Sequence, residues 1–170
     1  MYETMRLAIG LRMARAACQW TQQELADMMG VTKNVIARNE KSDMTMRADT
    51  LVKLIYTLNK RGVVLDIFST QDNISLNIVG SDLDAAAMRI ARAVLIINQQ
   101  EMADYLGLTK AIITRGERPK ACMTTDTWNT FKTKMEELGI LIEWVSSSNI
   151  NVLVTRPVIN FLVDDKSQSV

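Results

Sequence analysis

The sequence predicts a mainly α-helical protein with a small amount of β-structure, organised as two tandem four-helix units that each end in an antiparallel β-hairpin. The segment Gln22–Glu40, QQELADMMGVTKNVIARNE, returns 77 positions later at Gln99–Glu117 as QQEMADYLGLTKAIITRGE. Apolar residues at helical spacing give way to short β-branched runs after Gly62 and again after Gly139. A hydrophobic fraction of 48% supplies enough apolar surface for a core.

The repeat is too long to be a chance motif. Fifteen of thirty positions are identical when Arg12–Lys41 is aligned with Arg89–Arg118. Self-similarity at a fixed offset indicates a duplicated structural unit. We therefore expect one unit over residues 1–80, a second over 81–163, and a flexible tail over 164–170.

Each unit is predicted to begin with a helix, over Thr4–Cys18 in the first unit and Leu83–Ile96 in the second. The pattern TQQE or NQQE follows, in which a capping residue precedes a glutamate by three positions. This spacing is typical of a capping box, where the cap side chain and the glutamate satisfy each other's backbone N–H groups. A second helix therefore begins at Gln22 and at Gln99.

The second helix is predicted to be short, because Gly30 and Gly107 can end it in the left-handed conformation without a Cβ penalty. Two residues later, Thr32 and Thr109 are placed to cap a third helix. The helical spacing of apolar residues predicts a fourth helix in each unit, marked by Leu51, Leu54, Ile55 and Leu58 and by Trp128, Phe131, Met135 and Leu138.

The β-branched runs predict one hairpin per unit, VVLDIF (63–68) with ISLNIV (74–79), and ILIEWV (140–145) with INVLV (150–154). Isolated hairpins are marginal in water, so we expect the strands to assemble into a shared sheet. They could pair within one chain as an intramolecular pseudo-dimer, or between two chains as a homodimer. The run TRPVINFLV (155–163) is predicted to form one more strand, which Pro157 would confine to an edge of the sheet.

A short capped helix, a glycine turn and a second capped helix make a helix-turn-helix, whose second helix fits the DNA major groove. The segment WTQQELADMMGVTKNVIARNEK resembles the Cro/repressor (XRE-type) helix-turn-helix family. The segment NQQEMADYLGLTKAIITRGER resembles it less completely. The resemblance implies a small helical DNA-binding domain that works as a dimer on operator half-sites, and hence a sequence-specific transcriptional regulator, as repressors of this family are.

Position within the motif assigns the candidate DNA contacts. By the resemblance, Gln22 and Gln99 match a phosphate-contacting glutamine. Lysine or arginine pairs best with guanine and asparagine with adenine, which makes the start of the third helix a candidate reading surface. The full set predicted to contact double-stranded DNA is Gln22, Gln23, Thr32, Lys33, Asn34, Ala37, Arg38, Lys41, Gln99, Gln100, Thr109, Lys110, Ala111, Thr114 and Arg115.

A structural role is predicted for a second repeated pair. Arg12 and Glu40, which return as Arg89 and Glu117, resemble the family's ion pair between the first and third helices. We expect these residues to stabilise the scaffold and not to contact DNA.

Composition excludes several kinds of chemistry. There is no histidine, so a Ser-His-Asp triad and a histidine-bound metal are excluded. The two cysteines, Cys18 and Cys122, lack CxxC spacing, and no glycine-rich phosphate loop is present. We expect no enzymatic activity, no cofactor and no metal.

Charge and hydropathy bear on partners and location. The formal net charge is +1, but residues 1–66 carry a net +3 and residues 82–145 a net −1, so phosphate attraction favours the first half. The opening MYETMR leads into an amphipathic pattern, and no apolar run approaches the roughly 20 residues of a membrane span. We expect a soluble cytoplasmic protein without a membrane partner.

A second function stays open on these grounds. The neutral-to-acidic second unit and the pairable strand edges also fit a protein-binding or assembly module, antitoxin-like or anti-activator in character, that uses the helix-turn-helix units as scaffold. A protein partner would then accompany the DNA operator or replace it.

Overall fold

The computed structural model describes residues 1–120 and 122–169. The elements follow the chain in the order α1 (Tyr2–Cys18), α2 (Gln22–Met29), α3 (Lys33–Glu40), α4 (Ala48–Asn59), β1 (Val63–Asp66), β2 (Asn73–Val79), α5 (Leu83–Leu95), α6 (Gln99–Leu106), α7 (Lys110–Gly116), α8 (Thr125–Leu138), β3 (Ile140–Ser146), β4 (Asn149–Thr155) and α9 (Arg156–Gln168). The protein is mostly helical with one small sheet, which confirms the predicted class at that level.

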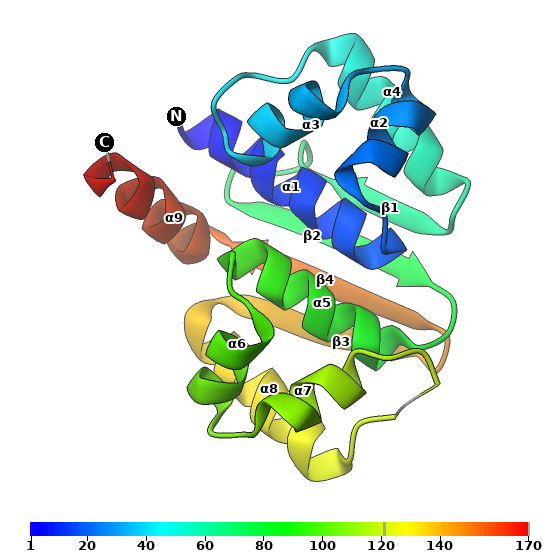
Figure 1. Ribbon diagram of the computed structural model, residues 1–170, viewed down its shortest axis with the longest axis vertical. Coiled ribbons are helices and arrows are strands. Elements are labelled where there is room, and N and C mark those ends of the chain that lie inside the picture. The colour runs from blue at the N-terminus through cyan, green and yellow to red at the C-terminus, as the bar shows by residue number, and fades with distance from the viewer. Residues whose placement is uncertain (121, 170) are drawn as a thin grey trace.

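The strands form one four-stranded antiparallel sheet in the order β1-β2-β4-β3. Helices α1 and α5 lie side by side against one face of this sheet (Figure 1). Helices α2, α3 and α4 lie at one end of the molecule, and α6, α7 and α8 lie at the other (Figure 1). The sheet and the α1–α5 pair therefore form the centre to which both groups of helices are attached.

Alternation along the strands produces the buried face of the sheet. In β2, Ile74, Leu76 and Ile78 are buried, and the residues between them are only half-buried. Successive side chains of a strand point to opposite faces, so every second residue packs under the helices. The buried residues of both hairpins and of the helices belong to a single apolar cluster.

The two hairpins pair with each other within the chain. β2 and β4 are antiparallel neighbours over seven residue pairs, from Asn73 opposite Thr155 to Val79 opposite Asn149. The sequence left open whether the strands pair within one chain or between two chains, and in this structure they pair within one chain. The seven β2–β4 residue pairs give hydrogen-bonding partners to backbone groups that an isolated hairpin would leave unpaired along this edge.

Gly139 makes the switch from helix to strand at the end of α8. Its φ is +98°, and a Cβ built there would lie 2.5 Å from Oγ1 of Thr155. That hydroxyl donates a hydrogen bond to the carbonyl oxygen of Gly139 at 2.7 Å. Only glycine permits both this backbone conformation and this approach of the β4 end to the helix end.

The edge strand predicted for residues 155–163 is wrong, because this segment begins α9. Pro157 lies in the first turn of that helix, where its missing N–H has no helical partner to lose and its fixed φ suits the helix. Val158, Ile159 and Leu162 are buried, a spacing that places them on one helical face, and α9 packs against α1. The helix continues through Gln168, and so through most of the segment predicted as a tail.

Candidate nucleic-acid interface

The first pair of helices, α2 and α3, is held in shape by its caps. The backbone N–H of Glu24 donates to Oγ1 of Thr21 at 3.1 Å, and the N–H of Thr21 donates to Oε2 of Glu24 at 2.7 Å. The hydrogen bond from the Thr21 backbone N–H lowers the pKa of the Glu24 carboxyl. Gly30 ends α2 with a φ of +65°. The predicted capping box and glycine turn are both confirmed.

The second pair, α6 and α7, has the same construction. The N–H of Glu101 donates to Oδ1 of Asn98 at 2.8 Å, and the N–H of Asn98 donates to Oε1 of Glu101 at 3.2 Å. Gly107 ends α6 with a φ of +68°. Thr109 caps α7 by accepting from the N–H of Ile112 at 3.4 Å, whereas Thr32 occupies the N-cap of α3 without a side-chain hydrogen bond.

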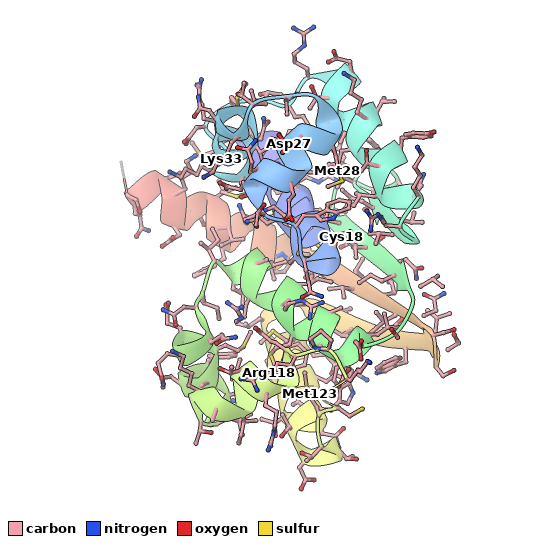
Figure 2. All side chains as sticks on the ribbon, turned by 45° about the vertical axis from the view of Figure 1, so that its right-hand side comes forward. Cys18, Asp27, Met28, Lys33, Arg118 and Met123 are labelled. Carbon is pink, nitrogen blue, oxygen red and sulfur yellow. The ribbon has the colours of Figure 1, made fainter. Side chains whose placement is uncertain are left out.

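One face of α3 projects into solvent. Lys33, Asn34 and Arg38 are exposed, Ala37 is half-buried, and Ile36 on the opposite side is fully buried. Among residues 1–120 and 122–169, no hydrogen bond or ion pair involves the side chains of Lys33, Asn34 or Arg38. These side chains are therefore available to a ligand, and Figure 2 shows Lys33 at the start of α3.

The corresponding face of α7 carries a different set of groups. Lys110, Ala111 and Arg115 are exposed and Thr114 is half-buried. Together with Ile112 and Arg118 they line a surface depression of about 530 Å³. Arg118, which follows α7 (Figure 2), was not among the predicted contacts. The signal for it was present, because Arg118 stands 77 positions after Lys41, which was predicted.

The ion pair behind α3 involves a different arginine from the one predicted. Nε of Arg15 lies 2.5 Å from Oε1 of Glu40, and Nη2 of Arg15 donates to Oε2 at 3.2 Å. Arg12 instead donates from Nη1 to the backbone carbonyl of Glu40 at 2.5 Å. The predicted side-chain pair of Arg12 with Glu40 is therefore wrong, because the two arginines are one helical turn apart and Arg15 is the one that faces the carboxylate. Gln22 adds a hydrogen bond from Nε2 to Oε2 of Glu40 at 2.7 Å.

The same correction holds behind α7. Arg92, and not Arg89, pairs with Glu117, with Nε 2.5 Å from Oε1 and Nη2 3.0 Å from Oε2. Gln99 donates to Oε2 of Glu117 at 2.8 Å and accepts from Oγ1 of Thr114 at 2.9 Å. Two of the predicted DNA contacts, Gln99 and Thr114, are thus hydrogen-bonded to each other.

Two further predicted contacts have partners on their own helix. Nε2 of Gln23 donates to Asp27 at 2.7 Å, and Nε2 of Gln100 donates to Asp104 at 2.8 Å. Both pairs are exposed, so a phosphate could compete for the same amide hydrogens.

Arg12 and Arg89 connect the two halves of the molecule. Nε of Arg12 donates to the carbonyl of Ala93 in the last turn of α5 at 3.0 Å, and Nε of Arg89 donates to the carbonyl of Ala16 in the last turn of α1 at 3.4 Å. Carbonyls in the last turn of a helix lack helical partners and carry the negative end of its dipole. Burial lowers the pKa of Arg12 to about 10, which still leaves it charged at neutral pH.

A cavity of about 1030 Å³ lies between the two helix pairs. It is bounded by α1, α5, the starts of α2 and α6, the end of α3, and one side of α9. Lys166 of α9 donates to the carbonyl of Lys41, to Ser42 at 2.8 Å and to Asp43 at 2.9 Å, which fastens α9 to the end of α3. The charged side chains of the lining are Arg12, Arg15, Lys41, Arg89, Arg92, Lys166, Glu40, Asp43 and Asp165.

The first helix pair and the helices around it have the architecture of a helix-turn-helix domain. A family model described as Helix-turn-helix matches residues 11–63, which run from α1 to the start of β1. That match indicates a DNA-binding regulator in general terms. No curated protein and no solved structure matches the chain.

Within the residues that the structure describes, no helix is both long enough and apolar enough to cross a membrane.

Proposed function

We propose that the protein is a sequence-specific, double-stranded DNA-binding transcriptional regulator that places α3, and with it α7, in the major groove. The observation that carries the proposal is the exposed face of α3. It presents Lys33, Asn34 and Arg38 without internal partners, on the helix after the glycine turn of a segment that matches a helix-turn-helix family model. We call this face, with Ala37, the first reading face.

The chemistry of the first reading face suits base edges. A lysine or arginine donates to O6 and N7 of guanine, and an asparagine forms two hydrogen bonds with adenine. Each good bidentate pair contributes about 1–3 kcal/mol of discrimination against a wrong base. Lys33 and Asn34 lie in the first turn of α3, and the N-terminal turn of a recognition helix is the part that reaches bases.

We further propose that residues 1–80 and 81–163 are tandem units and that α7 supplies a second reading face, formed by Lys110, Ala111, Thr114 and Arg115. The support is the recurrence of the same capping box, glycine turn and arginine–glutamate–glutamine cluster 77 positions along. One chain would then do the work of a dimer on half-sites about one helical turn apart.

The two reading faces differ, so the DNA site should be unequal. Asn34 is replaced by Ala111, which has no hydrogen-bonding group, and Ala37 is replaced by Thr114, whose hydroxyl is committed to a glutamine. The second face should read fewer bases and bind mainly through phosphates. An imperfect palindrome, or two unlike half-sites, is the expected operator.

The test begins with selection of bound duplexes from a random DNA pool, followed by fluorescence anisotropy on the selected site. The double variant Lys33→Ala with Arg38→Ala should lose specific binding by at least a hundredfold, because two base or phosphate contacts disappear. The matched control is Lys53→Ala with Lys60→Ala, which removes the same charge from exposed positions of α4 and at its end. Equal affinities for the two double variants would remove α3 from the reading role.

A protein-binding function has one observation in its favour. β1 and β3 are the outer strands of the sheet, and β3 exposes 44% of Trp144 and 62% of Val145. An outer strand can pair with a strand of another chain. Light scattering on the nuclease-treated protein tests this alternative, since a stable dimer or hetero-complex without DNA would support it and a monomer would not.

A further inference from the structure

We infer that Ile96 is an apolar wedge that enters the DNA minor groove between the two half-sites and bends the duplex. The inference rests on the proposed function, since it needs a duplex that spans both reading faces. Four features of the structure carry it: the conformation of Ile96, its exposure, its place in the cavity between the helix pairs, and the charge of that cavity.

Ile96 has a backbone conformation that its side chain disfavours. It follows α5 with φ 58° and ψ 43°, in the left-handed region. A β-branched residue there is a true outlier, because its branched Cβ crowds the backbone. The other non-glycine residues with positive φ among those described are all polar, namely Gln19, Ser42, Asp82 and Lys120. Asparagine or glycine would fit this position with less strain, so isoleucine lowers the stability of the fold here.

The side chain of Ile96 is also poorly buried for its type. It is 64% exposed, so the strain is not offset by packing in the apolar core. Ile96 lines the cavity of about 1030 Å³ between the two helix pairs. Its counterpart 77 positions earlier, Gln19, has a φ of 54° and lines the same cavity. The two repeats therefore differ at this equivalent position: the second repeat places an apolar side chain at the cavity, and the first places a polar one.

The charge of the cavity suits a polyanion. Its lining holds six arginine or lysine and three aspartate or glutamate side chains, a surplus of three positive charges on a chain with a formal net charge of +1. Glu117 does not line the cavity but pairs with Arg92, which does; when Glu117 is counted, the surplus is two positive charges. Charge complementarity therefore favours a polyanion over a neutral or cationic ligand, and the exposed reading face of α3 beside the cavity makes DNA the polyanion that we infer.

The geometry of B-DNA points to the minor groove. Two recognition helices that enter the major groove about one turn apart on one side of a duplex leave a minor groove facing the protein between them. One wall of the cavity comes from α2 and α3 and the other from α5 up to the N-cap of α6, and we infer that this opening lies opposite that groove. Isoleucine is among the side chains that proteins insert between base steps there, which partly unstacks the bases and bends the duplex by about 20–90°.

The difference between Ile96 and Gln19 predicts an off-centre bend in the DNA. The amide of Gln19 cannot act as an apolar wedge, so the unstacked step should lie on the side of the site nearer to Ile96. The bend would then be displaced from the centre of the operator, and the flexible TA or CA/TG steps should be favoured on one side only.

The test compares Ile96→Asn with Ile96→Leu on the selected duplex, using end-to-end fluorescence energy transfer for the bend and 2-aminopurine fluorescence for unstacking. Ile96→Asn should raise Tm by about 2–4 °C because it relieves the strained backbone. It should also abolish the bend and weaken binding about tenfold. Ile96→Leu should keep the bend, and the matched control Gln19→Asn should leave both bend and affinity unchanged.

Each outcome decides one of the two proposals. An unchanged bend and affinity in Ile96→Asn, with binding still lost in Lys33→Ala with Arg38→Ala, would overturn the wedge and leave the reading faces in place. A straight duplex in the wild-type complex, or a lower Tm in Ile96→Asn, would also overturn the wedge. A wild-type protein that selects no duplex at all would overturn the proposed function itself.

Discussion

Glu40 offers a direct test of how the first helix pair is held together. Its carboxylate is buried, with a relative exposure of 6%, and it accepts hydrogen bonds from Arg15 and Gln22. Glu40→Gln keeps the shape of the side chain and removes the charge. The new amide then faces three donor groups, Nε and Nη2 of Arg15 and Nε2 of Gln22, with one acceptor oxygen and one NH₂ group of its own.

The loss of stability expected from Glu40→Gln depends on how exposed its ion-pair partner Arg15 is. Breaking a fully buried ion pair costs about 3–5 kcal/mol, but the side chain of Arg15 is 30% exposed and regains some water. We expect Glu40→Gln to lower the free energy of unfolding by about 2 kcal/mol, which corresponds to a fall in Tm of about 4–8 °C for a chain of this length. Glu117→Gln should have a similar effect, because Arg92 is 22% exposed and Gln99 stands where Gln22 does.

Urea unfolding followed by circular dichroism measures these values, and a double-mutant cycle assigns the partner. Arg15→Met combined with Glu40→Gln should show a coupling energy of about 2 kcal/mol, since the two side chains form two hydrogen bonds with each other. The cycle of Arg12→Met with Glu40→Gln should give a clearly smaller value, because Arg12 bonds only the backbone carbonyl of Glu40. A larger coupling for Arg12 than for Arg15 would refute the arrangement.

Three further predictions test other parts of the molecule. Gly139→Ala should destabilise the protein by about 3 kcal/mol in thermal unfolding, because the new Cβ would lie 2.5 Å from Oγ1 of Thr155 at a φ of +98°. Gly30→Ala, with a φ of +65° and nothing within 4 Å of the new Cβ, should cost only about 1 kcal/mol, so equal losses would count against this explanation. The hydrogen bond from Lys166 lowers the pKa of Asp43 below 3.8, so this contact stabilises the fold at higher pH and is lost as the pH falls through that lowered pKa. Carboxyl NMR titration should show the Asp43 pKa rising toward its usual value in Lys166→Met, and an unmoved pKa would exclude the contact in solution. The exposed cations of the reading faces and of the residues after α3 and α7 are Lys33, Arg38, Lys41, Lys110, Arg115 and Arg118. If all of them meet phosphates, log K should fall with log salt concentration with a slope of about −5, whereas a slope near zero would exclude phosphate contacts.

Local signals in the sequence were sufficient to predict the two helix pairs, α2–α3 and α6–α7. The capping boxes at Thr21 and Asn98 and the turns at Gly30 and Gly107 were all predicted, because each depends on residues within a few positions of one another. The sequence could not choose between one chain and two for the shared sheet, because the alternation in a strand specifies its buried face but not its partner.

The wrong predictions concern an ion pair between residues far apart in the sequence and one segment whose pattern suits both a helix and a strand. Arg12 and Arg15 are both repeated 77 positions later, so the repeat could not identify which of them faces Glu40. The segment 155–163 contains β-branched and aromatic residues that also suit a strand, but Pro157 in the first turn and packing against α1 favour the helix. The partners of Gln99 were not predictable either, because they depend on the approach of α7 to α6.

Hydroxyl-radical footprinting of the wild-type protein on its selected duplex tests the central claim most directly. We predict two protected patches on one side of the duplex, about 10 base pairs apart and unequal in depth, with the deeper patch lost in Lys33→Ala combined with Arg38→Ala. A single patch would contradict the tandem arrangement, and an unprotected duplex would contradict DNA binding by these helices.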